Sequence, residues 1–211
     1  MAQTPCDLAG LGVLVTRPAH QADGLCQLIQ ASGGAPLAFP ALEIAPPADP
    51  EQAAAYLRRL ADFQIAIFIS PNAVSRALAL LAGAELPPEL QLAAVGKGTA
   101  NALAAAGYSV DITPNERFDS EALLQSRELQ AVGGKRVLIV RGVGGRALLG
   151  DTLTERGAQV SYAEVYQRRL PECDPTPLLE RWDDVDVVVA TSGEILDNLW
   201  HLLGSEGRAR L

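Results

Sequence analysis

The sequence predicts an α/β fold with mainly parallel sheets, and three observations predict it. Short apolar runs alternate with segments of helical periodicity along the whole chain. The apolar runs lack the strict alternation of strands that face water on one side, so they are expected to be buried on both faces. The same series of strand and helix units also occurs twice, which indicates a duplication.

The expected strands are the apolar runs, most of which are bounded by glycine, proline or a hydroxyl residue. They are GVLVT (12–16), APLAF (35–39), IAIFI (65–69), LAAV (92–95), YSVDIT (108–113), KRVLIVRG (135–142), AQVSYAEVYQR (158–168) and DDVDVVVAT (183–191). The proline-rich segment 40–50, which follows the second of these strands, is expected to be a linker or crossing segment.

The expected helices follow the strands and carry apolar residues at helical spacing. In the first of them Leu25, Leu28 and Ile29 are expected on the inward face, and Asp119 or Ser120 is expected to cap the fifth. The segments are 21–33, 51–63, 72–83, 98–107, 119–129, 145–157 and 193–204.

An internal repeat relates residues 13–42 to residues 137–165 and places Arg17 on Arg141. IFISPNAV (67–74) likewise aligns with VVATSGEI (188–195), each a strand that stops at a hydroxyl residue and continues as a helix. The first half has a further strand–helix unit without a counterpart in the second. By the logic of the repeat, a strand and a helix are expected to follow Leu211.

Composition limits the kinds of partner. The formal charge is -8 and aromatic residues make up 5%, so nucleic acids and anionic membranes are poor partners. No apolar run approaches the roughly 20 residues that a membrane helix needs, and no secretory signal is visible. Three cysteines without metal-like spacing, Cys6, Cys26 and Cys173, favour free thiols in the cytoplasm.

Five strand-to-helix turns carry small or hydroxyl residues: TRP (16–18), SPN (70–72), GKGTA (96–100), RGVGGR (141–146) and TSGE (191–194). Helix N-termini present free N–H groups and partial positive charge, and in parallel sheets they lie where ligands bind. The turns therefore predict a site for a ligand with several anionic groups. Plain helix capping is the competing interpretation, with Pro71 at a first helical position and a Thr191–Glu194 capping box.

Familiar catalytic patterns are absent from the sequence. His20 and His201 belong to no metal-spaced cluster, no G-x-S-x-G elbow occurs, and GKGTAN is a weak nucleotide signal. An enzyme of this composition is expected to need no metal and to work by positioning and electrostatic stabilisation.

Seven stretches taken in order resemble the uroporphyrinogen-III synthase family over about residues 12–200. They are VLVTRP, FPALEI, FISPNAV, AVGKGTANAL, VLIVRG, GAQVSYAEVYQR and VVVATSGEILDNL. The resemblance implies a cofactor-free enzyme that closes hydroxymethylbilane, a linear tetrapyrrole with eight carboxylates. The reaction loses water and inverts the last pyrrole ring through a spirocyclic intermediate to give uroporphyrinogen III.

The resemblance also implies two similar α/β domains that face a cleft and are joined by a two-stranded connector. The first domain is discontinuous, residues 1–39 plus 168–211, and the second is residues 44–163, with connectors at 39–44 and 163–168. Members usually continue for some tens of residues beyond this point. The enzyme is expected to be a cytoplasmic monomer.

The resemblance carries roles to individual residues. Tyr166 matches a tyrosine proposed to assist loss of the hydroxyl group, and a phenol of ordinary acidity keeps a proton to donate at neutral pH. A connector role for Tyr166 and plain surface roles for the two arginines remain open. The expected substrate-binding residues are Arg17, Ser70, Pro71, Asn72, Lys97, Gly98, Thr99, Arg141, Ser192 and Gly193, with Ile69 in place of the family's usual threonine.

Two other functions stay open on the sequence alone. A non-catalytic two-domain α/β protein could bind a polyanionic small molecule through the same N–H groups. A nucleotide-sugar transferase also pairs two α/β units, but the chain has no clear nucleotide fingerprint.

Overall fold

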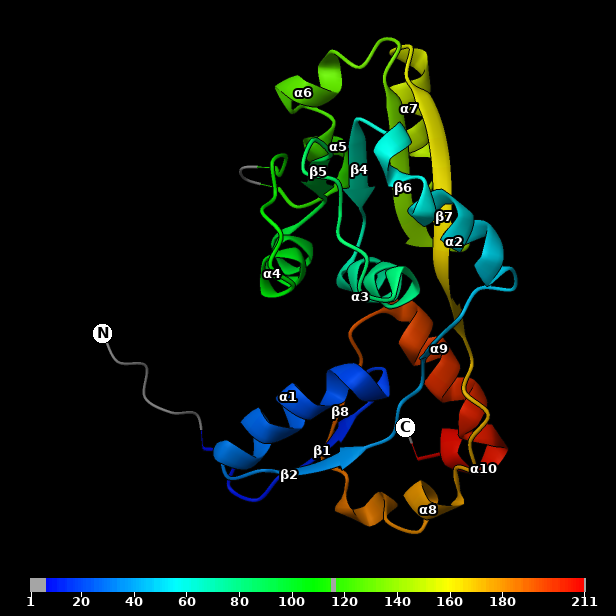
Figure 1. Cartoon of the computed structure of the whole chain (residues 1–211). Coiled ribbons are helices and arrows are strands. Elements are labelled where there is room, and N and C mark those ends of the chain that lie inside the picture. Colours follow the sequence, from blue (N-terminus) through cyan, green and yellow to red (C-terminus); the bar gives the residue numbers. More distant parts are fainter. Residues whose placement is uncertain (1–6, 115–116, 211) are drawn as a thin grey trace. The chain divides into compact units, whose positions relative to one another are not determined.

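The computed structural model describes residues 7–114 and 117–210. The chain divides into two compact units, which are treated separately below. Unit 1 comprises Met1–Ile44 and Arg168–Leu211, and unit 2 comprises Ala45–Gln167. Both units combine parallel strands with helices, so the predicted α/β class is confirmed (Figure 1).

Unit 1 contains a three-stranded parallel sheet in the order β2-β1-β8. The strands are β1 (Gly12–Val15), β2 (Ala35–Ala38) and β8 (Val187–Val189). The central strand β1 is fully buried, as its unbroken apolar run predicts. The helices are α1 (Ala19–Ala31), α8 (Thr176–Leu179), α9 (Gly193–Leu202) and α10 (Gly204–Arg208), and Trp182–Asp184 form a 3-10 turn.

Unit 2 is built on the sheet β3-β7-β6-β4-β5, in which β7, β6, β4 and β5 run parallel. The strands are β3 (Glu43–Ala45), β4 (Ile65–Phe68), β5 (Gln91–Ala94), β6 (Arg136–Gly142) and β7 (Gln159–Arg169). The chain passes between the units within β3 and within β7. The helices are α2 (Pro50–Arg58), α3 (Pro71–Leu81), α4 (Lys97–Ala105), α5 (Ser120–Leu123), α6 (Arg127–Gln130) and α7 (Leu148–Glu155), with a 3-10 turn at Leu60–Asp62.

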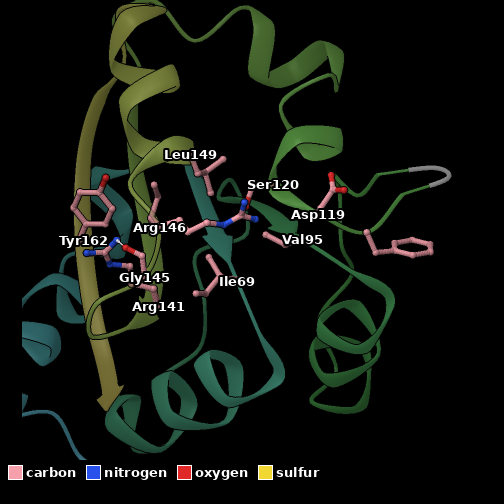
Figure 2. A pocket seen from close by; sticks show the side chains of 11 residues that line it. Ile69, Val95, Asp119, Ser120, Arg141, Gly145, Arg146, Leu149 and Tyr162 are labelled. Atoms are coloured by element: carbon pink, nitrogen blue, oxygen red, sulfur yellow. Dashed lines mark hydrogen bonds between the residues drawn. The ribbon is translucent and has the colours of Figure 1, made fainter. Parts of the chain in front are cut away.

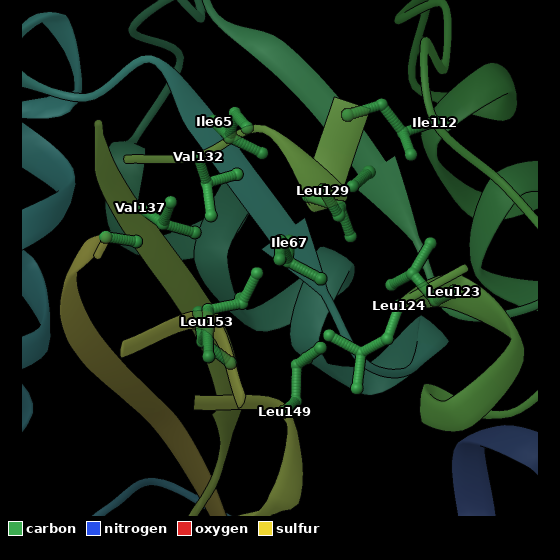
Figure 3. Packing of buried hydrophobic residues seen from close by; sticks show 13 residues of the cluster. Ile65, Ile67, Ile112, Leu123, Leu124, Leu129, Val132, Val137, Leu149 and Leu153 are labelled. Carbon is green, nitrogen blue, oxygen red and sulfur yellow. The ribbon is translucent and has the colours of Figure 1, made fainter. Parts of the chain in front are cut away.

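One core cluster of unit 2 lies against one face of its sheet, and strand residues of the other face, such as Phe68 and Leu138, are buried as well. Alternate strand residues such as Ile65, Ile67 and Val137 point to the face of this cluster and pack against leucines of the covering helices, Leu129 and Leu153 among them (Figure 3). This cluster of buried aliphatic side chains is larger than the cluster of unit 1, and its burial stabilises the strands whose ends are described below.

The two segments that link the units are also held to each other on each side of the crossing. In unit 1 the Arg169 guanidinium donates to both carboxylate oxygens of Glu43, at 2.8 and 2.9 Å, and this pairing raises the pKa of Arg169. In unit 2 the Gln167 side-chain amide donates to the Pro46 carbonyl at 2.9 Å.

Two local predictions were wrong. Leu28 is 67% exposed, because the inward stripe of α1 runs through Ala22 and Ile29 with Leu25 beside them. Residues 108–113 form one bridge, Ala93 to Ile112, instead of a strand. The Asp111 carboxylate accepts the Leu92 N–H at 2.7 Å and so replaces the backbone partner that a longer ladder would use.

The other predicted elements differ in extent. Residues 119–129 form two short helices, α5 and α6, separated by a turn in which the Ser126 N–H donates to the Leu123 carbonyl. The last strand is only Val187–Val189. None of the helices in the described part of the chain is long and apolar enough to span a membrane.

Candidate functional site

In the sheet of unit 2, the connections between strands proceed in opposite directions from the neighbouring strands β4 and β6. From β4 the chain moves to β5 on one side, and from β6 it moves to β7 on the other. In open α/β sheets, ligands bind outside the carboxyl ends of the strands at such a switch point. Several predicted site residues follow these strand ends, and they are described first.

The N-terminus of α3 lies directly after β4. Ser70 has extended backbone angles, and its Oγ accepts the Ala73 N–H at 3.1 Å, so Ser70 caps the helix. Pro71 occupies the first helical position, as predicted, and Asn72 follows it. The sequence therefore forms a helix start here because a hydroxyl cap and a proline stand next to each other.

The N-terminus of α4 follows β5 and lies beside that of α3. A Cβ atom on Gly98 would stand 3.6 Å from the Pro71 ring, so the two helix starts are neighbours. Gly96 begins the helix without a side-chain cap, and the first turn holds no acidic residue. Thr99 is buried, and the Lys97 ammonium lies 4.9 Å from the centre of the Phe118 ring.

Tyr166 of β7 is 6% exposed, and its hydroxyl lies 3.1 Å from Ser70 Oγ. The tyrosine ring lies directly over Gly142 at the end of β6, where a Cβ atom would stand 2.5 Å from the ring. A register shift between Arg141 and Gly142 places Tyr166 opposite Gly142, and the Val143 N–H donates to the Tyr166 carbonyl at 2.8 Å. The bulge and the glycine therefore fix the ring beside the start of α3.

Arg141 is committed to neighbours in its own unit. Its guanidinium donates to Glu164 at 2.9 and 3.1 Å and to the Gly145 carbonyl at 3.2 Å, and it stacks on the Tyr162 ring at 4.2 Å. These contacts anchor the turn after β6. The ion pair with Glu164 also compensates the positive charge that was expected to meet a substrate carboxylate.

A cavity of about 260 Å³ opens at the same end of the sheet, on the side of α5 and α7 (Figure 2). Ile69, Val95 and Leu149 supply apolar wall, and Ser120 and Arg146 add polar groups to the lining. Of the site residues predicted from the sequence, Arg141 lines this cavity. The helix start at Asp119 and Ser120 was recognisable in the sequence and would have pointed to this end of the sheet. In the structure Asp119 caps α5 by accepting the Ala122 N–H at 2.8 Å.

Unit 1 holds the remaining predicted site residues. Ser192 caps α9 by accepting the Ile195 N–H at 3.2 Å, and Gly193 is the first helical residue. The expected Thr191–Glu194 capping box is wrong, because Ser192 is the cap and Glu194 pairs with Arg168 at 3.3 Å.

Arg17 follows β1, the central strand of unit 1. Its guanidinium donates to the Gln21 side chain at 3.2 Å. Just before it, the buried Thr16 hydroxyl donates to the Val189 carbonyl at 2.7 Å and ties the ends of β1 and β8 together. Arg17 therefore stands at the carboxyl edge of its own sheet, as Ser70 does in unit 2.

The arrangement favours recognition of carboxylates by helix N-termini. The starts of α3, α4 and α9 each carry backbone N–H groups without intrahelical partners. Among the described residues no group of three or more His, Cys, Asp or Glu side chains is placed to hold a metal ion.

Fold and site together define an α/β protein of two units with anion-receptive helix starts at the strand ends. The family described as uroporphyrinogen-III synthase HemD matches residues 23–211. The chain is 38% identical to uroporphyrinogen-III synthase of Escherichia coli, over 92% of this chain and 80% of that one. It is 39% identical to the Salmonella typhimurium enzyme, over 91% and 80%.

Solved structures share the fold. Mutant uroporphyrinogen III synthase of Thermus thermophilus gives a TM-score of 0.60 at 19% identity, covering 95% of this chain and 80% of that one. The Helicobacter pylori enzyme gives 0.53 at 16%, covering 92% and 78%. The chain belongs to the uroporphyrinogen-III synthase family, whose members are cyclising lyases of haem biosynthesis.

Proposed function

We propose that this chain closes hydroxymethylbilane to uroporphyrinogen III, with Tyr166 as the proton donor to the departing hydroxyl group. The observation that carries the assignment of Tyr166 is its position. It is a buried phenol at the switch point of unit 2, next to two helix starts that suit carboxylates. Nothing in the comparisons supports the alternative of a non-catalytic binding protein.

The first chemical step breaks the bond between carbon and the hydroxyl oxygen of the substrate. The electron pair of this bond leaves with the oxygen, which takes a proton from Tyr166 and departs as water. The pyrrole nitrogen stabilises the resulting azafulvene cation. The phenolate regains a proton from the pyrrole carbon that loses one when the macrocycle closes, so Tyr166 is restored without a cofactor.

Binding of the eight carboxylates is assigned to the helix starts. In unit 2 the proposed carboxylate-binding residues are Ser70, Pro71 and Asn72 at the start of α3 and Lys97, Gly98 and Thr99 at the start of α4. In unit 1 they are Ser192 and Gly193 at the start of α9. Arg17 and Arg141 act as helpers, with Arg141 limited by its pairing to Glu164. In a chain of net charge -8, backbone N–H groups provide local positive potential without adding ionisable residues.

We also propose that the enzyme acts in the cytoplasm as a monomer. We further propose that the two units are the two domains of the enzyme. Sedimentation at several protein concentrations measures the oligomeric state directly.

The test is Tyr166→Phe, assayed with freshly made hydroxymethylbilane. A positioned acid contributes roughly 10²–10⁴-fold, so kcat is expected to fall by that order while product affinity changes little. Uncatalysed closure gives the non-inverted isomer I, so the fraction of isomer III among the oxidised products should fall as well.

Tyr56→Phe is the matched control, because Tyr56 lies on α2 and packs edge-on against Phe63. Its activity should stay at the wild-type level. A Tyr166→Phe enzyme with wild-type rate and isomer ratio would transfer the donor role to a backbone N–H or a bound water. Wild-type protein that yields no isomer III would favour the binding protein.

A further inference from the structure

The hydrogen bond between Ser70 and Tyr166 raises the question of which hydroxyl donates. A serine hydroxyl has one proton and two lone pairs, and a tyrosine hydroxyl has one proton as well. Ser70 Oγ already accepts the Ala73 N–H at 3.1 Å, and Tyr166 Oη lies 3.1 Å away from the same oxygen. If Tyr166 donated to Ser70, its only proton would be directed away from a substrate.

Two physical effects favour donation by Ser70. Accepting the Ala73 N–H polarises the serine hydroxyl, and a polarised hydroxyl is a better donor. The start of α3 also carries partial positive charge, which favours a tyrosine oxygen lone pair facing the helix and the tyrosine proton pointing away. Both effects act in the same direction.

We propose that Ser70 is a positioning residue that donates its proton to the Tyr166 oxygen and thereby leaves the Tyr166 proton free for the departing hydroxyl group of the substrate. The inference rests on the proposed donor role of Tyr166. It replaces the substrate-binding role proposed above for the Ser70 side chain and leaves carboxylate binding at the start of α3 to the backbone N–H groups. Ser70 then acts on the reaction only through Tyr166.

The packing of Tyr166 fixes everything except the direction of its hydroxyl proton, and the hydrogen bond from Ser70 sets that direction. The ring is buried over Gly142, and its backbone carbonyl accepts the Val143 N–H. With ring and backbone fixed, only the hydroxyl proton can rotate. After proton transfer, the Ser70 hydroxyl remains pointed at the phenolate oxygen and stabilises it by a charge-assisted hydrogen bond.

The kinetic test compares Ser70→Ala with Ser70→Thr. Ser70→Ala removes the donor and is expected to lower kcat about three- to tenfold, the share of one hydrogen bond, with KM little changed. Ser70→Thr keeps a hydroxyl on an extended backbone that suits threonine, so it should restore the rate.

Ser70→Ala also removes a helix cap, which could lower activity through stability alone. Asp49→Ala controls for this effect, because the Asp49 carboxylate caps α2 by accepting the Gln52 N–H at 3.1 Å and is not part of the site. Its kcat and KM should stay at the wild-type values. In unit 1, Ser192→Ala removes a serine cap of nearly the same backbone geometry and serves as the control for thermal stability.

A double-mutant cycle separates positioning from independent binding. In the Tyr166→Phe background, Ser70→Ala is expected to change kcat by less than about twofold, because the hydroxyl on which Ser70 acts is gone. Raman difference spectra between wild type and Tyr166→Phe isolate the Tyr166 ring. The intensity ratio of its Fermi doublet distinguishes a phenol that accepts from one that donates, and it should report an acceptor that loses this character in Ser70→Ala.

Three results would overturn the inference. A Ser70→Ala enzyme whose KM rises at constant kcat would make Ser70 a substrate-binding residue. Equal effects of Ser70→Ala with and without the Tyr166 hydroxyl would make its contribution independent. A Raman signature of donation from Tyr166 to Ser70 would reverse the direction of the bond. Unchanged activity of Tyr166→Phe would instead refute the donor role itself, while the Raman result would still decide the direction.

Discussion

At the scale of single residues, Gly142 decides where the Tyr166 ring can lie. No other residue type fits under the ring, since even a methyl group would enter the space that the ring carbons occupy. The backbone of Gly142 needs no unusual conformation, because its φ angle is not positive. The requirement for glycine at this position is therefore one of space and comes from the tyrosine above it.

Gly142→Ala is predicted to displace Tyr166 and to cost activity more than stability. Overpacking at a fixed site costs about 1–3 kcal/mol, and the displaced hydroxyl would lose its distance to Ser70. Urea unfolding and kcat measured on the same preparation check the two effects. Gly24→Ala is the control, because a Cβ on this helical glycine meets nothing within 4 Å, and the exchange should leave activity unchanged. Wild-type kcat in Gly142→Ala would show that the ring tolerates movement.

At the scale of elements, the start of α5 depends on an ionised carboxylate. The Ala122 N–H, donated to Asp119, lowers the pKa of that carboxyl below its ordinary value of 3.8, and the nearby Arg117 at 2.9 Å contributes further. Because the folded-state pKa is the lower one, Asp119 stabilises the fold above the ordinary value. This contribution disappears as the pH falls through the lowered pKa.

Asp119→Asn is predicted to destabilise the protein at neutral pH and to become equal to wild type in acid. Asparagine is also a good helix cap, so the exchange removes mainly the charge. Urea midpoints of both proteins between pH 7 and pH 3 measure the effect, and the gap should close below about pH 4. A gap that is constant over this range would assign the stabilisation to the cap geometry.

The strand β8 has one partner, β1, among the described strands, and Val187 is 42% exposed. An edge strand of this kind offers unpaired backbone groups to other chains. Val187→Lys is predicted to slow aggregation with a stability change within about 0.5 kcal/mol. Light scattering on heating compares it with Leu170→Lys, which removes an exposed leucine outside the sheet of unit 1. Equal suppression by both exchanges would point to general surface apolarity as the cause.

The positions of the central strands could be predicted from the sequence, because buried parallel strands read as unbroken apolar runs. The contacts of Tyr166 could not. Its partner Ser70 is 96 positions away, and their meeting depends on a register shift that no local pattern encodes. The pairing of Arg141 with Glu164 depends on the register of the same two strands just before the shift. At Asp111, a side chain replaced a backbone partner, which strand propensity does not anticipate.

At the scale of the whole molecule, each unit has a core of its own. Val13, Val15, Ala22 and Ile29 form a small cluster in unit 1, and the larger cluster that includes Leu153 lies in unit 2. Separate cores allow the units to unfold in separate steps.

Leu153→Ala is predicted to lower the stability of unit 2 by about 2–5 kcal/mol, because Leu153 is fully buried in its core. Calorimetry should show one transition moving to lower temperature while a second one keeps its position. Leu148→Ala on the same helix is the control, since Leu148 is 38% exposed and should cost much less. A single transition that moves as a whole would mean that the units unfold together.

The central sheet of unit 1 is assembled from the two ends of the chain. Gly12 at the start of β1 is bonded to Asp186, 174 positions later, and β8 follows that residue. A ribosome adds about 5–20 residues per second, so β1 waits on the order of ten seconds or more for its second neighbour. All of unit 2 emerges in this interval, with every strand of its sheet. The nascent protein is therefore able to form the Ser70–Tyr166 pair before the sheet that precedes Arg17 closes, and a translational pause once residue 167 has left the ribosome would favour that order.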